Sequence, residues 1–188
     1  MPAPQPGPPA DLSPPVLTDG VVRLRLPADA DLPDIVAACQ DPEVSRWTLV
    51  PSPYGEADGR AFLAGQAPGR AAGTDVVLAV EEVATGRFVG LVGLHGIADG
   101  DAEIGYWTGP WGRGRGLTTR AVRLACGWAL GGLGLQRVGW AALVGNDASR
   151  RVAEKAGFRV LGALRRNLVQ RGTRVDGWVG DLLAEDLP

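Results

Sequence analysis

Apolar residues recur along the chain in two rhythms, every second residue in some stretches and every third or fourth in others. Alternation predicts half-buried strands, whereas the wider spacing predicts helices with one buried face. The predicted strands cover residues 21–26, 74–82, 88–97, 101–108, 137–144, 158–169 and 174–183. The predicted helices run from Asp29 or Asp31 to about Cys39, over 118–130 and over 146–156, with a weaker one over 56–66.

Turn residues separate these elements. Thr85-Gly86 and Ala98-Asp99-Gly100 predict two tight connections, so three consecutive strands are expected to run antiparallel. Residues 41–54 contain three prolines and predict a loop. The middle of the chain reads strand, glycine-rich loop, helix, strand, which is a βαβ crossover. The fold class is therefore α/β: a single domain with a central mixed, mostly antiparallel sheet flanked by helices.

The first 17 residues differ from the rest because prolines crowd them. Proline donates no backbone N–H, so residues 1–17 are predicted to be a disordered lead-in, with a docking ligand as the alternative, and the domain to occupy 18–188. The lead-in lacks the charged and apolar regions of a signal peptide. No apolar run reaches the roughly 18 residues of a membrane span, so no membrane contact is expected.

Composition narrows the function classes. The net charge is -2, which argues against a general nucleic-acid binder. One histidine and two cysteines are too few soft ligands for structural zinc, so no metal is expected. Cys39 and Cys126 both lie in apolar helical contexts and are read as buried reduced thiols, which fits a cytoplasmic protein.

Residues 113–116 read Arg-Gly-Arg-Gly and join a predicted strand to a predicted helix. Glycines let the backbone approach a ligand, and the free N–H groups of a helix start attract phosphate. Arg113 and Arg115 can add charged contacts. The loop follows a late strand in an antiparallel setting, which argues against a Rossmann site, and it lies between two firm elements, unlike a disordered RNA-binding tail.

A family resemblance appears in EIGYWTGPWGRGRGLTTRAVRLACGWAL followed by NDASRRVAEKAGF. These segments resemble the core of a GNAT (GCN5-related) N-acetyltransferase, whose loop motif is Q/R-x-x-G-x-G/A. Thr118 stands where the family has Gly or Ala. The openings DGVVRLRLPADADLPDI and DPEVSRW resemble its RimJ/RimL-like ribosomal-protein N-acetyltransferase branch. The resemblance covers about residues 18–185.

The resemblance implies acetyl-CoA as co-substrate, with no metal. Backbone groups near Trp107 and Thr108 would face the pantetheine arm, and an amide there would polarise the thioester carbonyl. Asn146 would contact the same arm, although it could equally be a helix cap. The implied pyrophosphate cradle is formed by Arg113, Gly114, Arg115, Gly116, Leu117, Thr118 and Thr119.

The reaction needs a group that takes the proton of an ammonium. Glu103 is the candidate base or substrate-orienting acid, because alternation puts it on one face with Gly105 and Trp107. His95 is the alternative base. Ser149 is the candidate proton donor to the departing thiolate, since Ala153 stands where many relatives have Tyr. Tyr106 ranks low as a donor, because it falls on the face opposite Glu103.

The predicted function is acetyl transfer from acetyl-CoA to a primary amine, either a protein N-terminus or a small molecule. A longer acyl donor is an open alternative, and so is a non-catalytic acetyl-CoA sensor of the same fold. Trp47, Tyr54 and Trp107 are predicted to line the acceptor pocket. Dimerisation is common among relatives and is an expectation here, and no nucleic-acid partner is expected.

Overall fold

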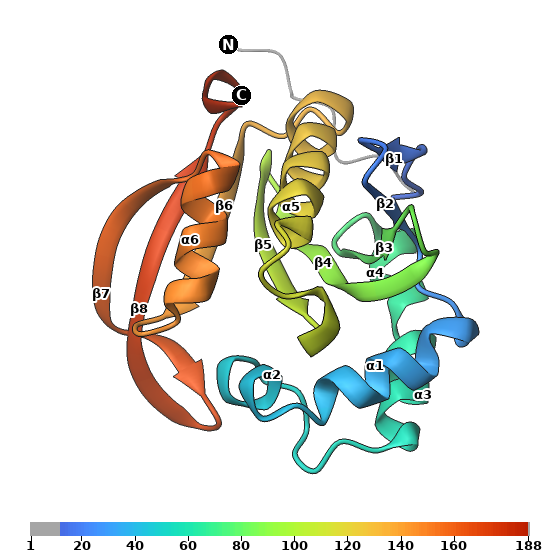
Figure 1. The fold of residues 1–188 in the computed structure, drawn as a ribbon. Coiled ribbons are helices and arrows are strands. Elements are labelled where there is room, and N and C mark those ends of the chain that lie inside the picture. The colour runs from blue at the N-terminus through green and yellow to red at the C-terminus, as the bar shows by residue number, and fades with distance from the viewer. Residues whose placement is uncertain (1–11, 188) are drawn as a thin grey trace.

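The computed structural model describes residues 12–187 as one sheet packed with helices (Figure 1). The strands are β1 (Leu17–Thr18), β2 (Val22–Arg25), β3 (Val76–Glu82), β4 (Arg87–Ala98), β5 (Asp101–Thr108), β6 (Arg137–Leu143), β7 (Arg159–Gln170) and β8 (Thr173–Leu182). The helices are α1 (Leu32–Cys39), α2 (Pro42–Trp47), α3 (Glu56–Ala64), α4 (Gln66–Ala72), α5 (Leu117–Gly127) and α6 (Asp147–Ala156).

The sheet has the order β1-β2-β3-β4-β5-β6-β8-β7. Neighbouring strands run antiparallel except for β5 and β6, which are parallel because α5 carries the chain from one to the other. A βαβ crossover within a mixed, mostly antiparallel sheet was the architecture expected from the order of the elements, and it is confirmed.

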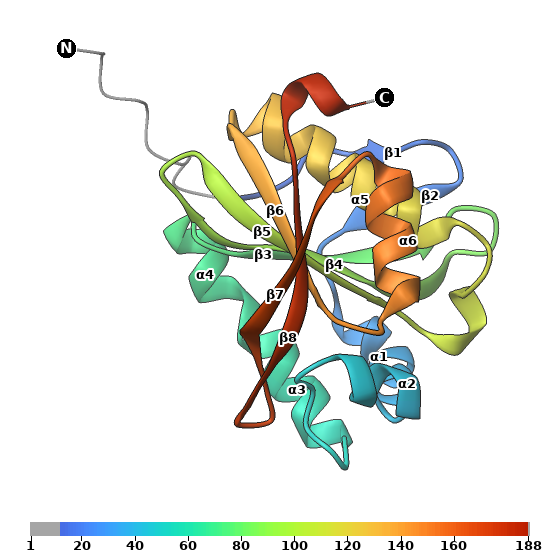
Figure 2. The ribbon, with the colours of Figure 1, turned by 90° about the vertical axis from the view of Figure 1, so that its left-hand side faces the viewer.

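Helices cover both faces of the sheet, so the molecule has two apolar cores (Figure 2). The larger core lies between the sheet and helices α5 and α6. Strand β3 contributes Val76, Leu78 and Val80 to it. The smaller core lies under α1 and α3, and it receives Ala79 from the opposite face of the same strand. Residues of β3 at even positions thus enter the larger core and Ala79 enters the smaller one, as side chains that alternate along a strand must.

Two helices were not expected. Residues 41–54 were predicted to be a loop, but α2 forms there because the Asp41 carboxylate accepts hydrogen bonds from the amides of Glu43 and Val44, and Pro42 occupies the first helical position. A further helix, α4, follows α3 directly after Gly65. The three prolines of 41–54 were read only as breakers, although the first of them starts a helix.

The folded chain also begins earlier than residue 18. Leu12 is fully buried in the larger core, and its amide donates to the Arg70 carbonyl of α4 at 3.3 Å. The predicted boundary of the lead-in is therefore wrong for residues 12–17, while residues 1–11 lie outside the described part of the chain.

The sheet is open at one place and irregular at another. β5 and β6 pair only from Asp101 with Arg137 to Ile104 with Trp140, and the rest of the two strands diverges. The outermost strand, β7, shifts register against β8 between Val160 and Gly162 and again between Leu164 and Leu168.

Candidate active site

The divergence of β5 and β6 opens a cavity of about 350 Å³ on the α5–α6 side. The first turn of α5, the start of α6 and the end of β5 meet there. Its lining includes most of the predicted cofactor residues: Trp107, Thr108, Arg113, Gly114, Gly116, Thr118, Thr119 and Asn146. Arg115 and Leu117 are the two that do not line it.

The glycine-rich loop delivers an open helix start to this cavity. Gly114 and Gly116 have φ of +73° and +75°, a backbone conformation that residues other than glycine adopt only at a cost in free energy. Gly116 is the N-cap residue of α5 and supplies no side-chain cap, so the first amides of the helix have no intrahelical acceptor. Partial positive charge is therefore directed at the cavity, as an anion site requires.

The backbone of β5 presents polar groups to the opening. The Gly109 amide donates to the Val89 carbonyl of β4 at 2.9 Å. Because backbone groups of a strand alternate between its two sides, the Trp107 amide also faces β4, whereas those of Tyr106 and Thr108 face the gap. Thr118, the residue that departs from the family motif, hydrogen-bonds through its hydroxyl to Thr108 and so ties α5 to the strand end.

Both arginines of the loop form ion pairs with carboxylates. Arg113 lines the cavity and donates to Asp41, the cap of α2, at 2.6 Å, which lowers the pKa of that carboxyl. Arg115 turns away and pairs with Glu82 at the end of β3, and this hydrogen bond lowers the pKa of Glu82. Leu117 is buried in the larger core.

A second cavity of about 430 Å³ lies on the other side of the opening. Glu103, His95 and Gly105 line it from the sheet, and Leu168 and Gln170 line it from the β7–β8 hairpin. Six residues line both cavities: Trp47, Thr48, Tyr106, Trp107, Asn146 and Ser149. The two spaces therefore meet at the point where β5 and β6 separate.

Glu103 and His95 face each other across β4 and β5 and share the floor of the second cavity. The Glu103 side chain is exposed, and within residues 12–187 it makes no hydrogen bond or ion pair. His95 Nδ1 lies 3.3 Å from Asp75 Oδ1, which also accepts from the Gly96 amide. Asp75 precedes β3 and was not noticed in the sequence, because nothing local links it to a histidine twenty positions away.

Ser149 lies in a hydrogen-bonded group between α6 and the sheet. Its hydroxyl donates to Tyr106 Oη at 3.2 Å and accepts from Trp140 Nε1 at 3.2 Å, while the Tyr106 hydroxyl donates to the Ser149 carbonyl at 2.9 Å. Burial raises the pKa of Tyr106, so its hydroxyl stays protonated. Asn146 caps α6 by accepting from the Ser149 amide at 3.1 Å.

Tyr106 was ranked low as a proton donor because it falls on the face opposite Glu103, and no observation tests that ranking. Tyr106 does lie opposite Glu103, yet that side of β5 is the one that α6 covers, so the phenol reaches both cavities and Ser149. Ala153, in contrast, is fully buried in the larger core. A tyrosine at position 153 would have no space, and Tyr106 is the tyrosine that lines both cavities.

Residues 45–50, which cover the site on one side, are hydrogen-bonded to the β7–β8 hairpin. Arg171 Nη2 donates to the carbonyls of Ser45 and Val50 at 3.0 and 3.1 Å, and Gln170 Nε2 donates to those of Arg46 and Thr48 at 3.1 Å each. We call these contacts of Gln170 and Arg171 with residues 45–50 the clasp. Trp47 and Trp107 line the cavities as predicted, whereas Tyr54 is buried in the smaller core and lines neither.

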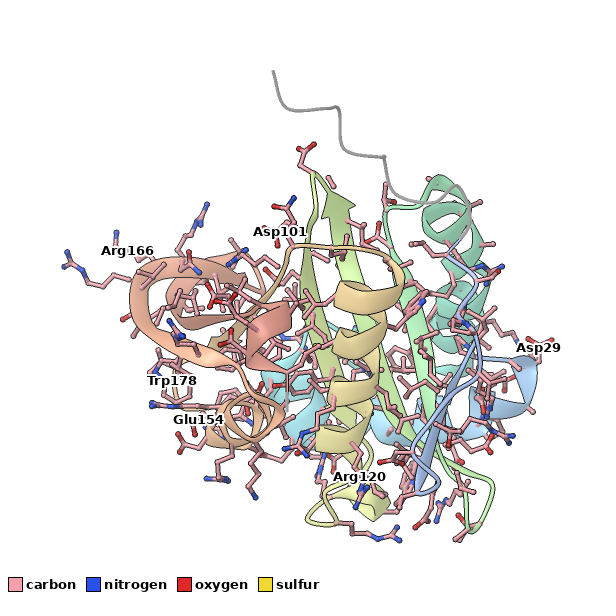
Figure 3. The ribbon with its side chains drawn as sticks, turned by 90° about the horizontal axis from the view of Figure 1, so that it is seen from above. Asp29, Asp101, Arg120, Glu154, Arg166 and Trp178 are labelled. Atoms are coloured by element: carbon pink, nitrogen blue, oxygen red, sulfur yellow. The ribbon has the colours of Figure 1, made fainter. Side chains whose placement is uncertain are left out.

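Two further pairs of adjacent arginines, Arg150-Arg151 and Arg165-Arg166, lie outside the glycine-rich loop. Arg151 lines the first cavity, while Arg150 pairs with Glu154 at 2.8 Å and stacks on Trp178. Arg166 projects from the outer edge of the molecule (Figure 3) and lines neither cavity. Across residues 12–187, no group of three or more His, Cys, Asp or Glu side chains is placed to hold a metal ion. No helix in the same range is both long and apolar enough to cross a membrane.

A family model, curated relatives and solved structures all relate this chain to acetyltransferases. The model of the acetyltransferase (GNAT) domain matches residues 22–159. A Bacillus subtilis (strain 168) protein described as "Putative ribosomal N-acetyltransferase YdaF" is 38% identical over 93 residues, which are 48% of this chain and 51% of that protein. The match therefore spans about half the length of this curated relative.

Solved structures show the fold over nearly the whole chain. A GCN5-related N-acetyltransferase from Brucella melitensis superposes with a TM-score of 0.79 at 26% identity, covering 97% of this chain and 84% of the other. Mycobacterium smegmatis RimJ, solved with CoA-disulfide, superposes with a TM-score of 0.80 at 22% identity, covering 93% and 88%. The family model confirms the acetyltransferase (GNAT) superfamily that the sequence resembles, and the superpositions show its fold.

Proposed function

Because the chain belongs to the acetyltransferase (GNAT) domain family, we propose that it transfers an acetyl group from acetyl-CoA to a primary amine. One observation carries the proposal. An open helix N-terminus and an unpaired strand end line one cavity, and that cavity meets a second one floored by Glu103. The first suits an anionic, extended donor and the second a cationic acceptor.

The donor fits the residues that are present. The amides of α5 at Gly116–Thr119 would hold the pyrophosphate, since they have no other acceptor and glycine at the cap keeps the approach clear. The free edge of β5 offers the amides of Tyr106 and Thr108 to the amide groups of the pantetheine arm and to the thioester carbonyl. Arg113 and Arg151, both in the lining, add positive charge.

Glu103 is assigned to the acceptor. Its carboxylate faces the second cavity, and no cation among the described residues neutralises it, so it attracts an ammonium group and orients it toward Trp107. The expected kinetic effect of Glu103→Gln is a KM for the amine raised by about tenfold, roughly 1.4 kcal/mol, with a smaller change in kcat.

Ser149 is assigned to the departing thiolate. Its hydroxyl can give up a proton because Trp140 N–H donates to the same oxygen and stabilises the charge that develops there. Tyr106 Oη accepts from that hydroxyl at 3.2 Å in the structure, and the Tyr106 O–H can restore the proton once it turns from the Ser149 carbonyl to Oγ. Ser149→Ala is expected to lower kcat by about ten- to a hundredfold, in the low part of the range for general acid catalysis.

A protein N-terminal amine is the acceptor class we favour. The relative YdaF carries the word ribosomal in its description. In this chain Thr48 and Gln170, which the clasp joins, line the second cavity on the side facing the β7–β8 hairpin, so part of a peptide acceptor can rest there. A short peptide with a free N-terminal serine or alanine is therefore the first acceptor to supply, beside a small aromatic amine and a polyamine.

Calorimetric titration with acetyl-CoA tests the donor site, using a Gly116→Trp variant. A Cβ added at Gly116 meets no atom within 4 Å, so the bulk of the indole enters the open space of the cradle, although the φ of +75° strains any residue other than glycine. Gly20→Trp is the matched control, because Gly20 has φ +84°, the same open space and no place in either cavity. We expect binding in wild type and control and a loss of at least about tenfold in Gly116→Trp. Wild-type protein that does not bind acetyl-CoA would overturn the proposal.

Release of the CoA thiol over the acceptor panel tests the reaction, with acetyl-CoA and succinyl-CoA compared as donors. Asp99→Asn serves as the control for Glu103→Gln, because Asp99 lies on the turn of the same hairpin outside both cavities. Acetyl-CoA binding without turnover of any amine would favour a sensor in place of an enzyme.

A further inference from the structure

His95 lies in an unusual position for a surface histidine. Its ring folds back along β4 and covers Gly93 and Gly105, which are partners across the two strands. A Cβ on Gly93 would come within 2.6 Å of His95 Nε2, and one on Gly105 would lie 3.6 Å from the same atom. The ring can occupy this place because position 93 is glycine, whereas a Cβ at position 105 would make only an ordinary van der Waals contact with it.

Asp75 fixes the other side of the ring. Its Oδ1 lies 3.3 Å from His95 Nδ1, and the Gly96 amide holds the same oxygen at 3.3 Å. A carboxylate accepts and cannot donate, so the neutral imidazole must carry its proton on Nδ1. The lone pair of Nε2 then faces the second cavity, above the two glycines.

We propose that Asp75 and His95 form a dyad in which His95 Nε2 takes the proton of the acceptor ammonium and Asp75 positions the ring. The inference rests on the proposed acetyl transfer and deepens it. Asp75 is the positioning residue and His95 the catalytic one, while Glu103 attracts the ammonium. Two carboxylates therefore face the imidazole, Asp75 from the segment before β3 and Glu103 from β5.

Reach along the strand favours His95 over Glu103 as the proton acceptor. Glu103 lies four residues from Trp107, which is roughly 13 Å along a strand. The ring of His95 starts opposite Glu103 but extends over Gly105, two residues or roughly 7 Å nearer to the end of β5. Nε2 is thus the basic atom placed closer to the junction of the two cavities.

The chemical step balances without another reactant. Nε2 forms a bond to one ammonium proton, so the acceptor becomes a neutral amine and His95 an imidazolium. The amine lone pair then forms the C–N bond at the thioester carbon as the C–S bond breaks, and its electron pair goes to sulfur. The second amine proton ends on the thiolate by way of Ser149, and the imidazolium returns its proton to water.

The tautomer can be read directly, because His95 is the sole histidine of the chain. Nitrogen-15 NMR of an untagged protein is expected to show the proton on Nδ1 at a pH where the ring is neutral, which is the less favoured form of free histidine. In Asp75→Asn the amide can donate to Nδ1, so the proton is expected to move to Nε2. A wild-type proton on Nε2 would overturn the dyad whatever the activity.

The kinetic arm uses the serine peptide as acceptor between pH 5 and 9. His95→Gln is expected to lower kcat/KM by about a hundredfold and to lose the acidic limb of the pH profile, with added imidazole restoring part of the rate in His95→Ala. Asp75→Asn is expected to lower kcat/KM by a smaller factor, because the ring remains but its tautomer changes, and Asp99→Asn is expected to leave kcat/KM unchanged.

A His95→Gln variant with the wild-type rate and profile would overturn this inference and leave acetyl transfer standing. Wild-type protein inactive toward every acceptor would overturn both the function and the role of the dyad in it, even with the proton on Nδ1.

Discussion

The Asp41 carboxylate both caps a helix and forms an ion pair. Its Oδ1 accepts from the amides of Glu43 and Val44 at 3.1 and 3.2 Å and so starts α2, and it also accepts from Arg113 at 2.6 Å. The first role needs only an acceptor oxygen, whereas the second needs a charge. Asn and Ala at this position therefore separate the cap from the ion pair.

We expect Asp41→Ala to reduce the free energy of unfolding by about 0.5–2 kcal/mol at pH 7, the usual cost of a lost cap. Asp41→Asn keeps an acceptor oxygen and should lose at most about 1 kcal/mol, the value of a partly exposed ion pair. Urea unfolding of the three proteins at pH 7 provides the measurement. Equal losses in Ala and Asn would show that the ion pair matters and the cap does not.

The same residue gives the stability a pH dependence of known sign. Arg113 lowers the pKa of the folded Asp41 carboxyl, so the charged form stabilises the fold at pH values above about 4, the ordinary aspartate range. This contribution is lost as the pH falls through the lowered pKa. The difference in unfolding free energy between wild type and Asp41→Asn is therefore expected to shrink when the urea series is repeated in mild acid.

Single residues were predicted best where local chemistry decides. The glycines of the loop and the cap Asn146 lie where their types predict, because positive φ and open helix amides are local demands. The contacts of Asp75 and Tyr106 were not predicted, because they depend on which segments meet at each face of the sheet. Period-2 alternation says that two residues face opposite ways and not what each one meets.

At the scale of elements, the clasp joins the first helices to the last hairpin. Arg171 and Gln170 bond chiefly to main-chain carbonyls, so residues 45–50 need no particular side chains for the contact. We expect Arg171→Ala to speed amide hydrogen exchange in α2 and to lower stability by about 1–2 kcal/mol, as a few hydrogen bonds are lost.

Arg174→Ala is the matched control for the clasp, since Arg174 donates to the Arg166 and Asn167 carbonyls of its own hairpin. Exchange mass spectrometry of peptides covering residues 42–50 distinguishes the two variants. If exchange in residues 42–50 stays slow in Arg171→Ala, packing of Trp47 and its neighbours, and not the clasp, keeps this segment in place.

Long elements with a clear period were predicted to within a few residues, as β5, β6 and α6 illustrate. The short helices α2 and α4 were not, because they contain too few residues to display a 3.6-residue period. The start of α2 could have been found from Asp41-Pro42 alone, a cap residue followed by proline at the first helical position.

For the molecule as a whole, the larger core extends to the first described residue. Leu12 is fully buried, whereas Val16 is 82% exposed only four positions later. We expect Leu12→Ala to cost about 2–5 kcal/mol of unfolding free energy and Val16→Ala to change it by less than about 0.5 kcal/mol. Thermal and urea unfolding of both variants measure the contrast. A small loss in Leu12→Ala would mean that the domain does begin near residue 18.

The two register shifts of β7 have a consequence for self-association. A sheet that ends in a long, regular strand offers its free backbone groups to any other chain, and natural proteins interrupt such edges with bulges and charges. β7 leaves Leu161 and Leu164 exposed, yet one register shift falls at Leu161 and the next begins after Leu164, and Arg165 and Arg166 follow directly. The strand that could most easily recruit a copy of itself is thus bent and charged, which protects this sheet from continuing into a fibre.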